Sequence, residues 1–272
     1  MHKAILMLLT LPLLIQAAEL EERAANPGGI RVVTVDPTPE PDHIETKIIF
    51  PKKGELKTST PIGIQVKLEG WPLGTDSEFP RKKQIYNNPD GQTLHVIIDN
   101  YPYFELNEAF ITAVDDSEEY YDQTLEFDIP FDLDEGQHLI RIFPARSFCE
   151  SIKDEGFATR IFYYLDADKN SNRYDITQPY LTYNEPQGNY KYSPKTPILL
   201  DFIISNVMLS RDGYKVRLTI DKKDKRTLTS QNPYFIYGLQ PGKHEIRLEL
   251  LDSENVLVPG PLNTVSRTIT IE

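Results

Sequence analysis

The sequence predicts an all-β chain of two tandem β-sandwich domains, and a repeated motif is the main reason. Leu133–Ile142 (LDEGQHLIRI) recurs as Leu239–Leu248 (LQPGKHEIRL), with Leu, Gly, His, Ile and Arg at matching places. Further segments match in the same order around each copy, which predicts an internal duplication. The chain of 272 residues is long enough for two cores, and its 15 Tyr and 12 Phe, against three Met and one Trp, favour strands.

The expected first domain covers residues 44–166, and its strands alternate apolar and polar residues. In Thr60–Leu68 the alternate residues are Ile, Val and Leu, which is the period of a half-buried strand. In Gly91–Asp99 the alternate apolar residues are expected to face the core, with His95 and Asp99 on the other face. The expected strands are Thr46–Pro51, Thr60–Leu68, Gly91–Asp99, Leu125–Phe131, Leu133–Ile142 and Thr159–Leu165.

The expected second domain covers residues 196–272 and repeats this order. Gly213–Asp221 corresponds to Gly91–Asp99 without a gap, beginning with glycine and ending with aspartate in both copies. Loop lengths differ between the copies, as sandwich folds tolerate. The remaining expected strands, on either side of the second motif, are Thr196–Ile204, Pro233–Leu239 and Val265–Ile271.

Three further segments lie outside the predicted domains. Residues 1–17 have a basic start, an apolar run and small residues at the end, which predicts a secretory signal peptide. Residues 18–43 are acidic and end in alternating prolines, which predicts a solvated tether, although Ile30–Val35 could instead add a strand to a sheet edge. Residues 167–195 are rich in Tyr, Asn, Pro and Gly and are expected to form an ordered aromatic connector.

Charge, cysteine content and hydropathy limit the expected partners and cellular location. The net charge is −12, with 41 Asp and Glu against 29 Lys and Arg, so the surface should repel phosphate backbones and nucleic acid is not expected as a partner. Cys149 is the only cysteine, which excludes an internal disulfide. The sequence has no long apolar run after the signal peptide, so no membrane span is predicted. The expected location is the periplasm or the extracellular space, and the oligomeric state is left open.

The repeated motif resembles the start of the sixth strand in fibronectin type III and related immunoglobulin-like domains. In those domains Leu-x-Pro-Gly precedes a Tyr that braces the corner between the fifth and sixth strands. His138 and His244 stand where that Tyr would be, so the resemblance implies two immunoglobulin-like, fibronectin type III-like sandwiches in which these histidines are structural corners. With its signal peptide, the chain also resembles exported bacterial proteins with tandem immunoglobulin-like domains, a group from which no functional residue carries over.

A metal site is an alternative interpretation of the histidines. His95 and His138 fall in one domain with Cys149 nearby, and imidazole and thiolate suit zinc or copper. The second copy keeps His244 but has Arg217 in place of His95. A histidine that recurs without its supposed partner favours the structural interpretation, and no cofactor is predicted.

A calcium loop is a second alternative. Asp166–Asn172 (DADKNSN) places oxygen-bearing side chains at alternate positions, as at the start of an EF-hand loop. Ser171 stands where the sixth-position glycine belongs, and Thr177 where the bidentate Glu belongs. A solvated turn is therefore predicted, and calcium binding is left open.

Aromatic side chains in the loops of the first domain are the predicted ligand-binding residues, because exposed aromatic rings stack on sugars and anchor protein partners. They are Trp71, Tyr101, Tyr103, Phe104, Tyr120 and Tyr121. The alternative interpretation is that these rings cover the ends of the core. The sequence has no Gly-x-Ser-x-Gly, phosphate-loop, His-Glu-x-x-His or Cys-x-x-Cys motif, so no enzymatic activity is predicted. The leading hypothesis is a non-enzymatic module that binds a protein or glycan. An architectural spacer is the second hypothesis, and a metal-binding envelope protein that uses His95 and His138 is the third.

Overall fold

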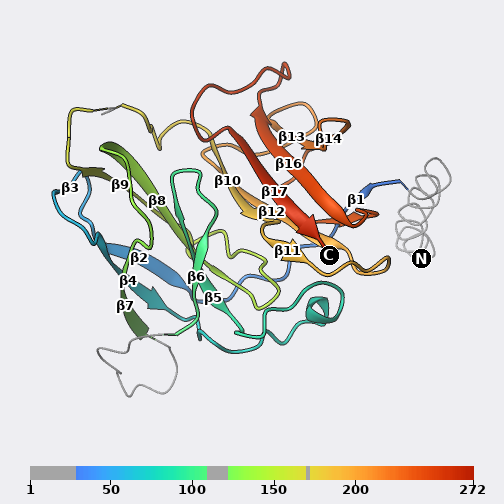
Figure 1. Cartoon of the computed structure of the whole chain (residues 1–272), viewed down its shortest axis with the longest axis horizontal. Coiled ribbons are helices and arrows are strands. Elements are labelled where there is room, and N and C mark those ends of the chain that lie inside the picture. Colours follow the sequence, from blue (N-terminus) through green and yellow to red (C-terminus); the bar gives the residue numbers. More distant parts are fainter. Residues whose placement is uncertain (1–28, 109–121, 170–171) are drawn as a thin grey trace, which may run out of the picture.

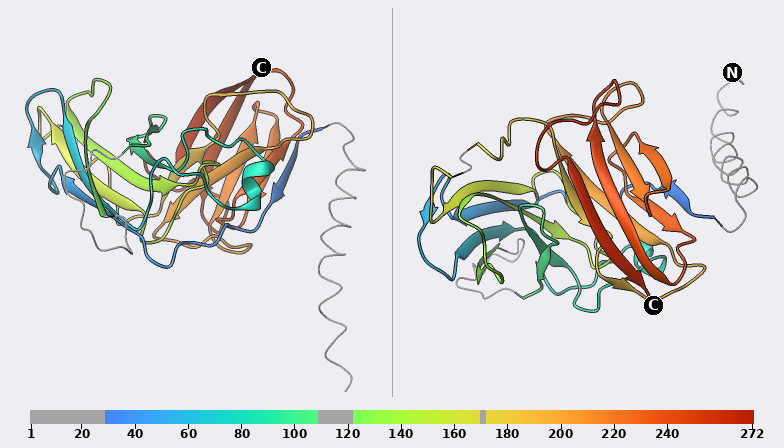
Figure 2. Two further views of the ribbon diagram at one scale, coloured as in Figure 1. Left: turned by 90° about the horizontal axis from the view of Figure 1, so that it is seen from below. Right: turned by 45° about the horizontal axis from the view of Figure 1, so that its top comes forward.

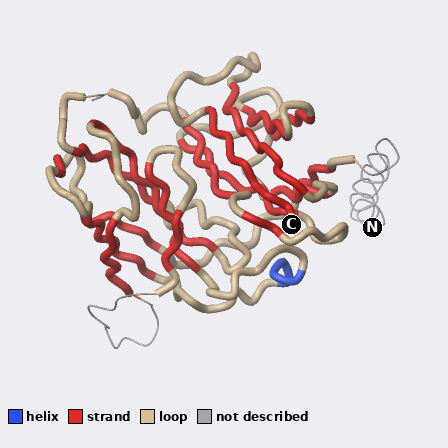
Figure 3. Tube along the Cα trace, viewed as in Figure 1, coloured by secondary structure: helices blue, strands red, loops and turns tan. Residues whose placement is uncertain are grey.

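The computed structural model describes residues 29–108, 122–169 and 172–272, and its regular structure is almost entirely β (Figure 1; Figure 3). Within these residues it has 17 strands and one short 3-10 helix, η1 (Pro80–Lys83). The predicted all-β sandwich fold is confirmed. The predicted signal peptide lies outside the described residues. In the part of the chain that is described, no helix is long and apolar enough to cross a membrane.

The first sandwich packs a three-stranded sheet against a five-stranded sheet (Figure 1). The smaller sheet has the order β2-β4-β7, formed by Glu45–Phe50, Gly63–Glu69 and Asp122–Asp128. The larger sheet has the order β3-β9-β8-β5-β6, formed by Leu56–Lys57, Ala158–Tyr164, Gly136–Ala145, Thr93–Ile98 and Phe104–Leu106. Neighbouring strands are antiparallel except β3 and β9, which are parallel.

The second sandwich packs a four-stranded sheet against a five-stranded sheet. The smaller sheet has the order β1-β15-β12-β10, formed by Arg31–Thr34, Tyr234–Tyr237, Ile198–Ser205 and Tyr180–Glu185. The larger sheet has the order β11-β17-β16-β13-β14, formed by Asn189–Tyr190, Thr264–Ile271, Gly242–Leu251, Lys215–Ile220 and Asp224–Leu228. Only β11 and β17 are parallel among these described pairs.

The two sandwiches share one topology, strand for strand. Strands β2 to β9 correspond to β10 to β17 in order, in pairing and in the single parallel contact of each copy. The first strand of each copy also has a register shift near its end, between Ile48 and Phe50 in β2 and between Tyr183 and Glu185 in β10. The internal repeat therefore extends over whole sandwiches and is not limited to the matched sequence segments.

The second sandwich takes strands from segments that the sequence assigns elsewhere. Strands β10 and β11 lie within 167–195, the expected connector, and β1 lies within 18–43, the expected tether, where it pairs with β15 at a sheet edge. The edge strand considered at Ile30–Val35 corresponds to β1. All six residues of β10 are buried, because the first sandwich covers the face turned away from the core. A strand buried on both faces has no alternating pattern by which to recognise it.

Each sandwich encloses its own apolar core between its two sheets. In the first, Val66 of β4, Val96 of β5 and Ile140 of β8 have no exposed surface. Leu94 and Ile98 join them, so the predicted inward positions of this strand are confirmed. Each such side chain contributes about 1.5 to 3 kcal/mol to folding relative to exposure.

A histidine and an aspartate close a corner of the first sandwich. Asp99 follows β5 with φ of 51°, and its Oδ1 accepts a hydrogen bond from the N–H of Leu139 at 2.9 Å. Its Oδ2 accepts from Nδ1 of His138 at 2.9 Å, and Nε2 of that histidine lies 2.7 Å from the carbonyl oxygen of Asp134. The pair therefore connects the turn after β5 to the start of β8.

The second sandwich contains the same corner. Asp221 also has φ of 51°, and its two carboxylate oxygens lie 2.9 Å from the N–H of Glu245 and 2.7 Å from Nδ1 of His244. Nε2 of His244 lies 2.8 Å from the carbonyl oxygen of Gln240. The histidine, the aspartate and the backbone carbonyl thus occur together in both copies.

Both histidines are positively charged in this geometry. Each ring nitrogen faces an oxygen that can only accept, so hydrogen bonds at both nitrogens require both to carry protons. Burial opposes the charge, but the aspartate and the carbonyl outweigh it, and the pKa of His138 and of His244 is raised above the ordinary value. Each corner is therefore an imidazolium–carboxylate pair.

The two sandwiches lie side by side and share a buried joint (Figure 2). The outer face of β5 and β8 meets the smaller sheet of the second sandwich, where Phe143 and Ile203 belong to one apolar cluster. Arg141 of β8 is 1% exposed and donates to the carbonyl oxygen of Leu181 and the hydroxyl of Thr182, both at 3.0 Å. Buried hydrogen bonds and apolar packing thus hold the sandwiches together.

The segment between β1 and β2 runs from the second sandwich to the first and crosses this joint (Figure 2, left). The N–H and hydroxyl of Thr38 donate to the two carboxylate oxygens of Glu150, each at 2.8 Å. Glu150 also pairs with Arg81, and Arg146 donates to the carbonyl oxygen of Pro39. This part of the expected tether is therefore built into the folded structure.

Replacing His244 with Gln should weaken the pH dependence of stability. Because the folded-state pKa is raised, the stabilising charge is fully present below the unfolded pKa of about 6.5 and is lost as the pH rises through the folded-state pKa. Urea titrations should show wild-type unfolding free energy falling between about pH 6 and about pH 8.5 more steeply than that of His244→Gln. Lys243→Gln, a neighbouring exposed substitution, should keep the wild-type slope. Equal slopes in all three proteins would contradict the charged corner.

Replacing Arg141 with Ala should destabilise the joint. The substitution removes the donors from two buried carbonyls and a buried hydroxyl, and each unsatisfied group costs about 1 to 3 kcal/mol. We expect a loss of about 3 kcal/mol or more in the unfolding free energy, measured by urea denaturation. Arg211→Ala, on an exposed loop, is the control and should change stability by less than about 0.5 kcal/mol. Similar values for both variants would show that the buried guanidinium contributes little.

Candidate functional site

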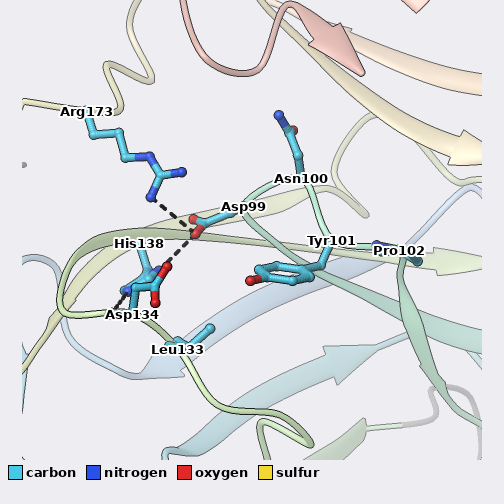
Figure 4. A pocket seen from close by; sticks show the side chains of 8 residues that line it. All are labelled: Asp99, Asn100, Tyr101, Pro102, Leu133, Asp134, His138 and Arg173. Carbon is cyan, nitrogen blue, oxygen red and sulfur yellow. Dashed lines mark hydrogen bonds and ion pairs between the residues drawn. The ribbon is translucent and has the colours of Figure 1, made fainter. Parts of the chain in front are cut away.

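A cleft of about 310 Å³ opens at the histidine corner of the first sandwich (Figure 4). We call it the corner cleft. It is formed by the turn between β5 and β6, the loop between β7 and β8, and one residue from the segment between β9 and β10. Its lining residues are Asp99, Asn100, Tyr101, Pro102, Leu133, Asp134, His138 and Arg173.

Asp99 lies between two cations in the corner cleft. His138 donates to Oδ2 of Asp99 at 2.9 Å, and NH1 of Arg173 lies 3.9 Å from the same oxygen (Figure 4). Arg173 opposes the upward shift in the pKa of His138, because like charges disfavour one another. The carboxylate is buried, whereas the guanidinium is partly exposed, so Arg173 can present donors to a ligand.

Tyr101 provides an exposed aromatic ring beside these charges. The residue is 45% exposed, and its ring packs against Phe131 with centroids 4.9 Å apart and planes 37° apart. Its N–H donates to the carbonyl oxygen of Ile98 at 3.0 Å, which fixes the backbone of the turn. The ring is therefore supported on one side and accessible on the other.

A shallow groove continues from the corner cleft. It has a volume of about 630 Å³ and shares Leu133, Asp134 and Arg173 with the cleft. Its further lining residues are Asp132, Glu135, Tyr164, Leu165 and Lys169. Nζ of Lys169 lies 3.4 Å from a carboxylate oxygen of Glu135, so charges of both signs line this surface. The combined depression can accommodate an elongated ligand.

The corner cleft presents charged and hydrogen-bonding side chains around its histidine. Both ring nitrogens of His138 are occupied as donors, so the imidazolium cannot accept a proton from a nucleophile. The side chains that line the cleft include no Ser, Thr, Cys or Lys that a base could activate. The carboxylate of Asp134 and the guanidinium of Arg173 are hydrogen-bonding groups beside the ring of Tyr101, whereas the amide of Asn100 donates to the carbonyl oxygen of Pro261 at 2.6 Å.

The corner of the second sandwich lacks these additions. At the positions equivalent to Asn100, Tyr101 and Asp134 it has Lys222, Lys223 and Gln240. The corner itself is thus common to both copies, whereas the aromatic ring and the carboxylate beside it belong to the first.

The predicted ligand-binding aromatics do not gather in one place. Trp71 is 3% exposed and fills the core of the first sandwich, so the expectation that it contacts a ligand is corrected. Tyr103 and Phe104 line a separate pocket at the joint between the sandwiches. Tyr101 alone among the predicted residues that are described lies in the corner cleft. Tyr120 and Tyr121 lie outside the described residues.

The two histidines considered as metal ligands face opposite sides of their sheet. His95 pairs with Phe143 in register, five positions along β8 from His138. Because alternate residues of a strand point to opposite faces, an odd offset turns the two rings apart. His95 is fully buried at the joint and bonds to Asn184. Among the described residues, no group of three or more His, Cys, Asp and Glu side chains is placed to hold a metal ion.

The segment considered as a calcium loop begins with a hydrogen-bonded turn. Oδ1 of Asp166 accepts from the N–H groups of Asp168 and Lys169 at 2.8 and 3.1 Å. Two of its seven residues, 170 and 171, lie outside the described part of the chain. The solvated turn stays a prediction.

Sequence reasoning did not identify Asn100, Asp134 and Arg173 as site residues. The sequence did contain one signal for the position of the cleft. Asp99 and Asp221 end the two matched glycine-to-aspartate segments, and in the structure each binds the histidine of its own copy. Arg173 had no such signal. It comes from a segment without periodicity, and folding alone brings it to the cleft.

No protein-family profile matches the chain, and no curated protein matches it in sequence. Among solved structures, the fibronectin(III)-like modules of Clostridium thermocellum CbhA align with a TM-score of 0.28 and 11% identity, covering 84% of this chain and 94% of theirs. The two tandem V-type regions of VCBP3, a v-region-containing chitin binding protein, align with a TM-score of 0.23 and 7% identity, covering 84% and 99%. The Bacteroides ovatus mixed-linkage glucan utilization locus protein SGBP-B, in complex with a mixed-linkage heptasaccharide, aligns with a TM-score of 0.18 and 13% identity, covering 84% and 47%.

Replacing Arg173 with Ala should raise the pKa of His138. Removing a positive charge beside the imidazolium stabilises its protonated form, so the pKa rises further above its ordinary value. The measurement is an NMR titration of the histidine ring resonances. His244, in the other sandwich, should titrate as in the wild type and serves as the internal reference. A fall in the pKa of His138 would contradict the described position of the guanidinium.

Proposed function

We propose that this protein is a non-enzymatic, exported binding module that recognises a glycan through the corner cleft of its first sandwich. One observation carries the proposal. The two sandwiches share a charged histidine corner, but the first places an exposed tyrosine, a carboxylate and a guanidinium beside it. The second sandwich has the same corner with Lys223 and Gln240 in place of the tyrosine and the carboxylate, which supports a role for these two groups beyond the fold.

This set of side chains suits a sugar. The accessible face of Tyr101 offers an apolar surface for the C–H face of a pyranose ring, and the phenol adds a polar edge. Asp134 and Arg173 supply planar groups that accept from or donate to sugar hydroxyls. A site of this kind gains its specificity from the placement of a few such polar groups.

The shape and charge of the surface narrow the class of glycan. The groove beyond the corner cleft extends the depression to about the size that several sugar units require. Asp132, Asp134 and Glu135 outnumber Lys169 and Arg173 along it. Together with the net charge of −12, this favours an uncharged oligosaccharide over a polyanionic one.

The architectural spacer is a second candidate function, favoured by the joint. Buried hydrogen bonds of Arg141 and Thr38 fix the two sandwiches to one another, as a rigid spacer would require. This observation does not account for the exposed ring and polar groups of the corner cleft. Export rests on the signal peptide predicted at residues 1–17, and we propose the periplasm or the extracellular space as the location.

Replacing Tyr101 with Ala should weaken glycan binding at least about tenfold, equivalent to about 1.4 kcal/mol. The wild type would first be screened on an array of neutral oligosaccharides, and the best ligand measured by isothermal titration calorimetry. Lys223→Ala, at the equivalent position of the second sandwich, should bind as tightly as the wild type. Thermal melts should show that both variants remain folded, because both side chains lie in exposed turns.

Two outcomes would overturn the proposal. If Tyr101→Ala and Lys223→Ala bind a glycan equally well, the corner cleft is not the site. If no array glycan binds and affinity capture from envelope extracts yields a saturable protein partner, the ligand is a protein. Failure of both assays would favour the spacer.

A further inference from the structure

A second pocket lies at the joint between the sandwiches, apart from the corner cleft. It has a volume of about 320 Å³ and takes its walls from both sandwiches. Tyr86, Tyr103 and Glu105 come from the first, and Glu185 and Tyr190 from the second. We call it the joint pocket. Tyr86, one of its lining residues, is 54% exposed, so the joint pocket is open to solvent beside Tyr86.

Asn184 fixes the protonation of the histidine beside this pocket. Nδ2 of Asn184 donates to the carbonyl oxygen of Cys149 and to the carboxylate of Asp201, both at 2.8 Å. Its Oδ1 therefore faces Nδ1 of His95, at 2.8 Å, as an acceptor. His95 must carry its proton on Nδ1, which leaves a lone pair on Nε2. Burial also lowers the pKa of His95 to about 4, so the ring is neutral at pH 7.

The lone pair of His95 has no partner. His95 is 0% exposed, its Nε2 makes no hydrogen bond, and this nitrogen lies 3.8 Å from a carboxylate oxygen of Glu105, which lines the joint pocket. The ring stacks on Tyr103, another lining residue, with centroids 3.7 Å apart. Two acceptors thus face one another without a donor between them, and a buried unsatisfied acceptor costs about 1 to 3 kcal/mol.

Glu185 adds a buried carboxylate on the other side of the pocket. The hydroxyls of Tyr103 and Tyr190 donate to its two oxygens at 2.5 Å each. Among the described residues, no Lys, Arg or His nitrogen forms an ion pair with it. Arg267, the nearby cation, instead donates to the carbonyl oxygens of Tyr183 and Asn184 and to Gln187. Burial raises the pKa of Glu185 to about 7, despite the two hydroxyl donors.

At this pocket, Nε2 of His95 is thus a buried acceptor without a partner, and aromatic rings lie beside it. Glu105 accepts from Nδ2 of Asn88 and Glu185 accepts from two tyrosine hydroxyls, but among the described residues neither carboxylate pairs with a Lys or an Arg. A ligand that supplied hydrogen-bond donors and positive charge would satisfy both carboxylates, and the faces of tyrosine rings attract cations. The pocket is much larger than a bare metal ion, and the described residues hold no cluster of metal ligands. The overall charge of −12 would also draw cations to it.

We propose that the joint pocket binds a small organic cation that bears a primary ammonium group. The ammonium donates to Glu105 and Glu185, and the carbon chain packs against the tyrosine rings. This site is independent of the corner cleft, so it holds whether or not the protein binds a glycan. Because both sandwiches contribute a carboxylate, occupancy also stabilises the joint.

The test uses isothermal titration calorimetry of the full chain with n-butylamine and 1,4-diaminobutane, and with 1-butanol as an uncharged probe of similar shape. We expect saturable binding of one amine per chain and no saturable binding of butanol. Glu105→Gln should weaken amine binding at least tenfold. Glu254→Gln, which removes the same charge from an exposed loop of the second sandwich, should bind as the wild type does.

A second variant and a second measurement distinguish loss of the binding site from loss of the fold. Glu185→Gln should also weaken binding at least tenfold, and near-UV circular dichroism would confirm that each variant is folded. The amine should also shift the ring ¹⁵N resonances of His95 in the wild type. Absence of saturable amine binding, equal binding of butanol, or equal affinity in Glu105→Gln and Glu254→Gln would each overturn the proposal.

Discussion

The charged histidine–aspartate pair is the constraint on which each sandwich depends. The aspartate must leave its strand with a positive φ, which places its carboxylate against both the histidine ring and a backbone N–H of the next long strand. The histidine in turn closes the loop before that strand through a carbonyl oxygen. One imidazolium thus fixes a turn, a loop and a strand. Because the same arrangement holds His244 and Asp221, the corner belongs to the repeated unit and not to a site on one domain.

The sequence was informative wherever a strand has one buried face. The inward residues of Gly91–Asp99 and the position of His138 beside the core follow from alternation and from the repeat. The same reasoning could not find β10, because both of its faces are buried and its residues do not alternate. For Trp71 the sequence leaves both ligand binding and core packing open, because a position in a loop does not fix exposure, and this loop folds back onto the core.

The candidate site was less predictable than the fold. Tyr101 could be proposed from its place after a strand, but Arg173 reaches the corner cleft from a segment whose path depends on tertiary packing. No pattern in the sequence links these two residues, since what brings them together is the docking of one sandwich against the other. A local pattern can show that a loop is polar or aromatic, but it cannot show which distant loop will complete the site.

Comparing the two copies position by position distinguishes the residues that face the core from those that face the other sandwich. Facing the core, Val96 and Ile98 correspond to Leu218 and Ile220, so these positions are apolar in both copies.

On the opposite face, Ile97 and Phe143 correspond to Thr219 and Glu249, so these positions are apolar in the first copy alone. Arg141 is buried against the second sandwich, whereas its equivalent Arg247 is partly exposed and pairs with Glu249. This face is therefore apolar in the copy that uses it to contact the other sandwich and polar in the copy that does not. The joint can thus be recognised from the difference between the copies, and the unsatisfied acceptor of His95, whose equivalent is Arg217, lies on the same face.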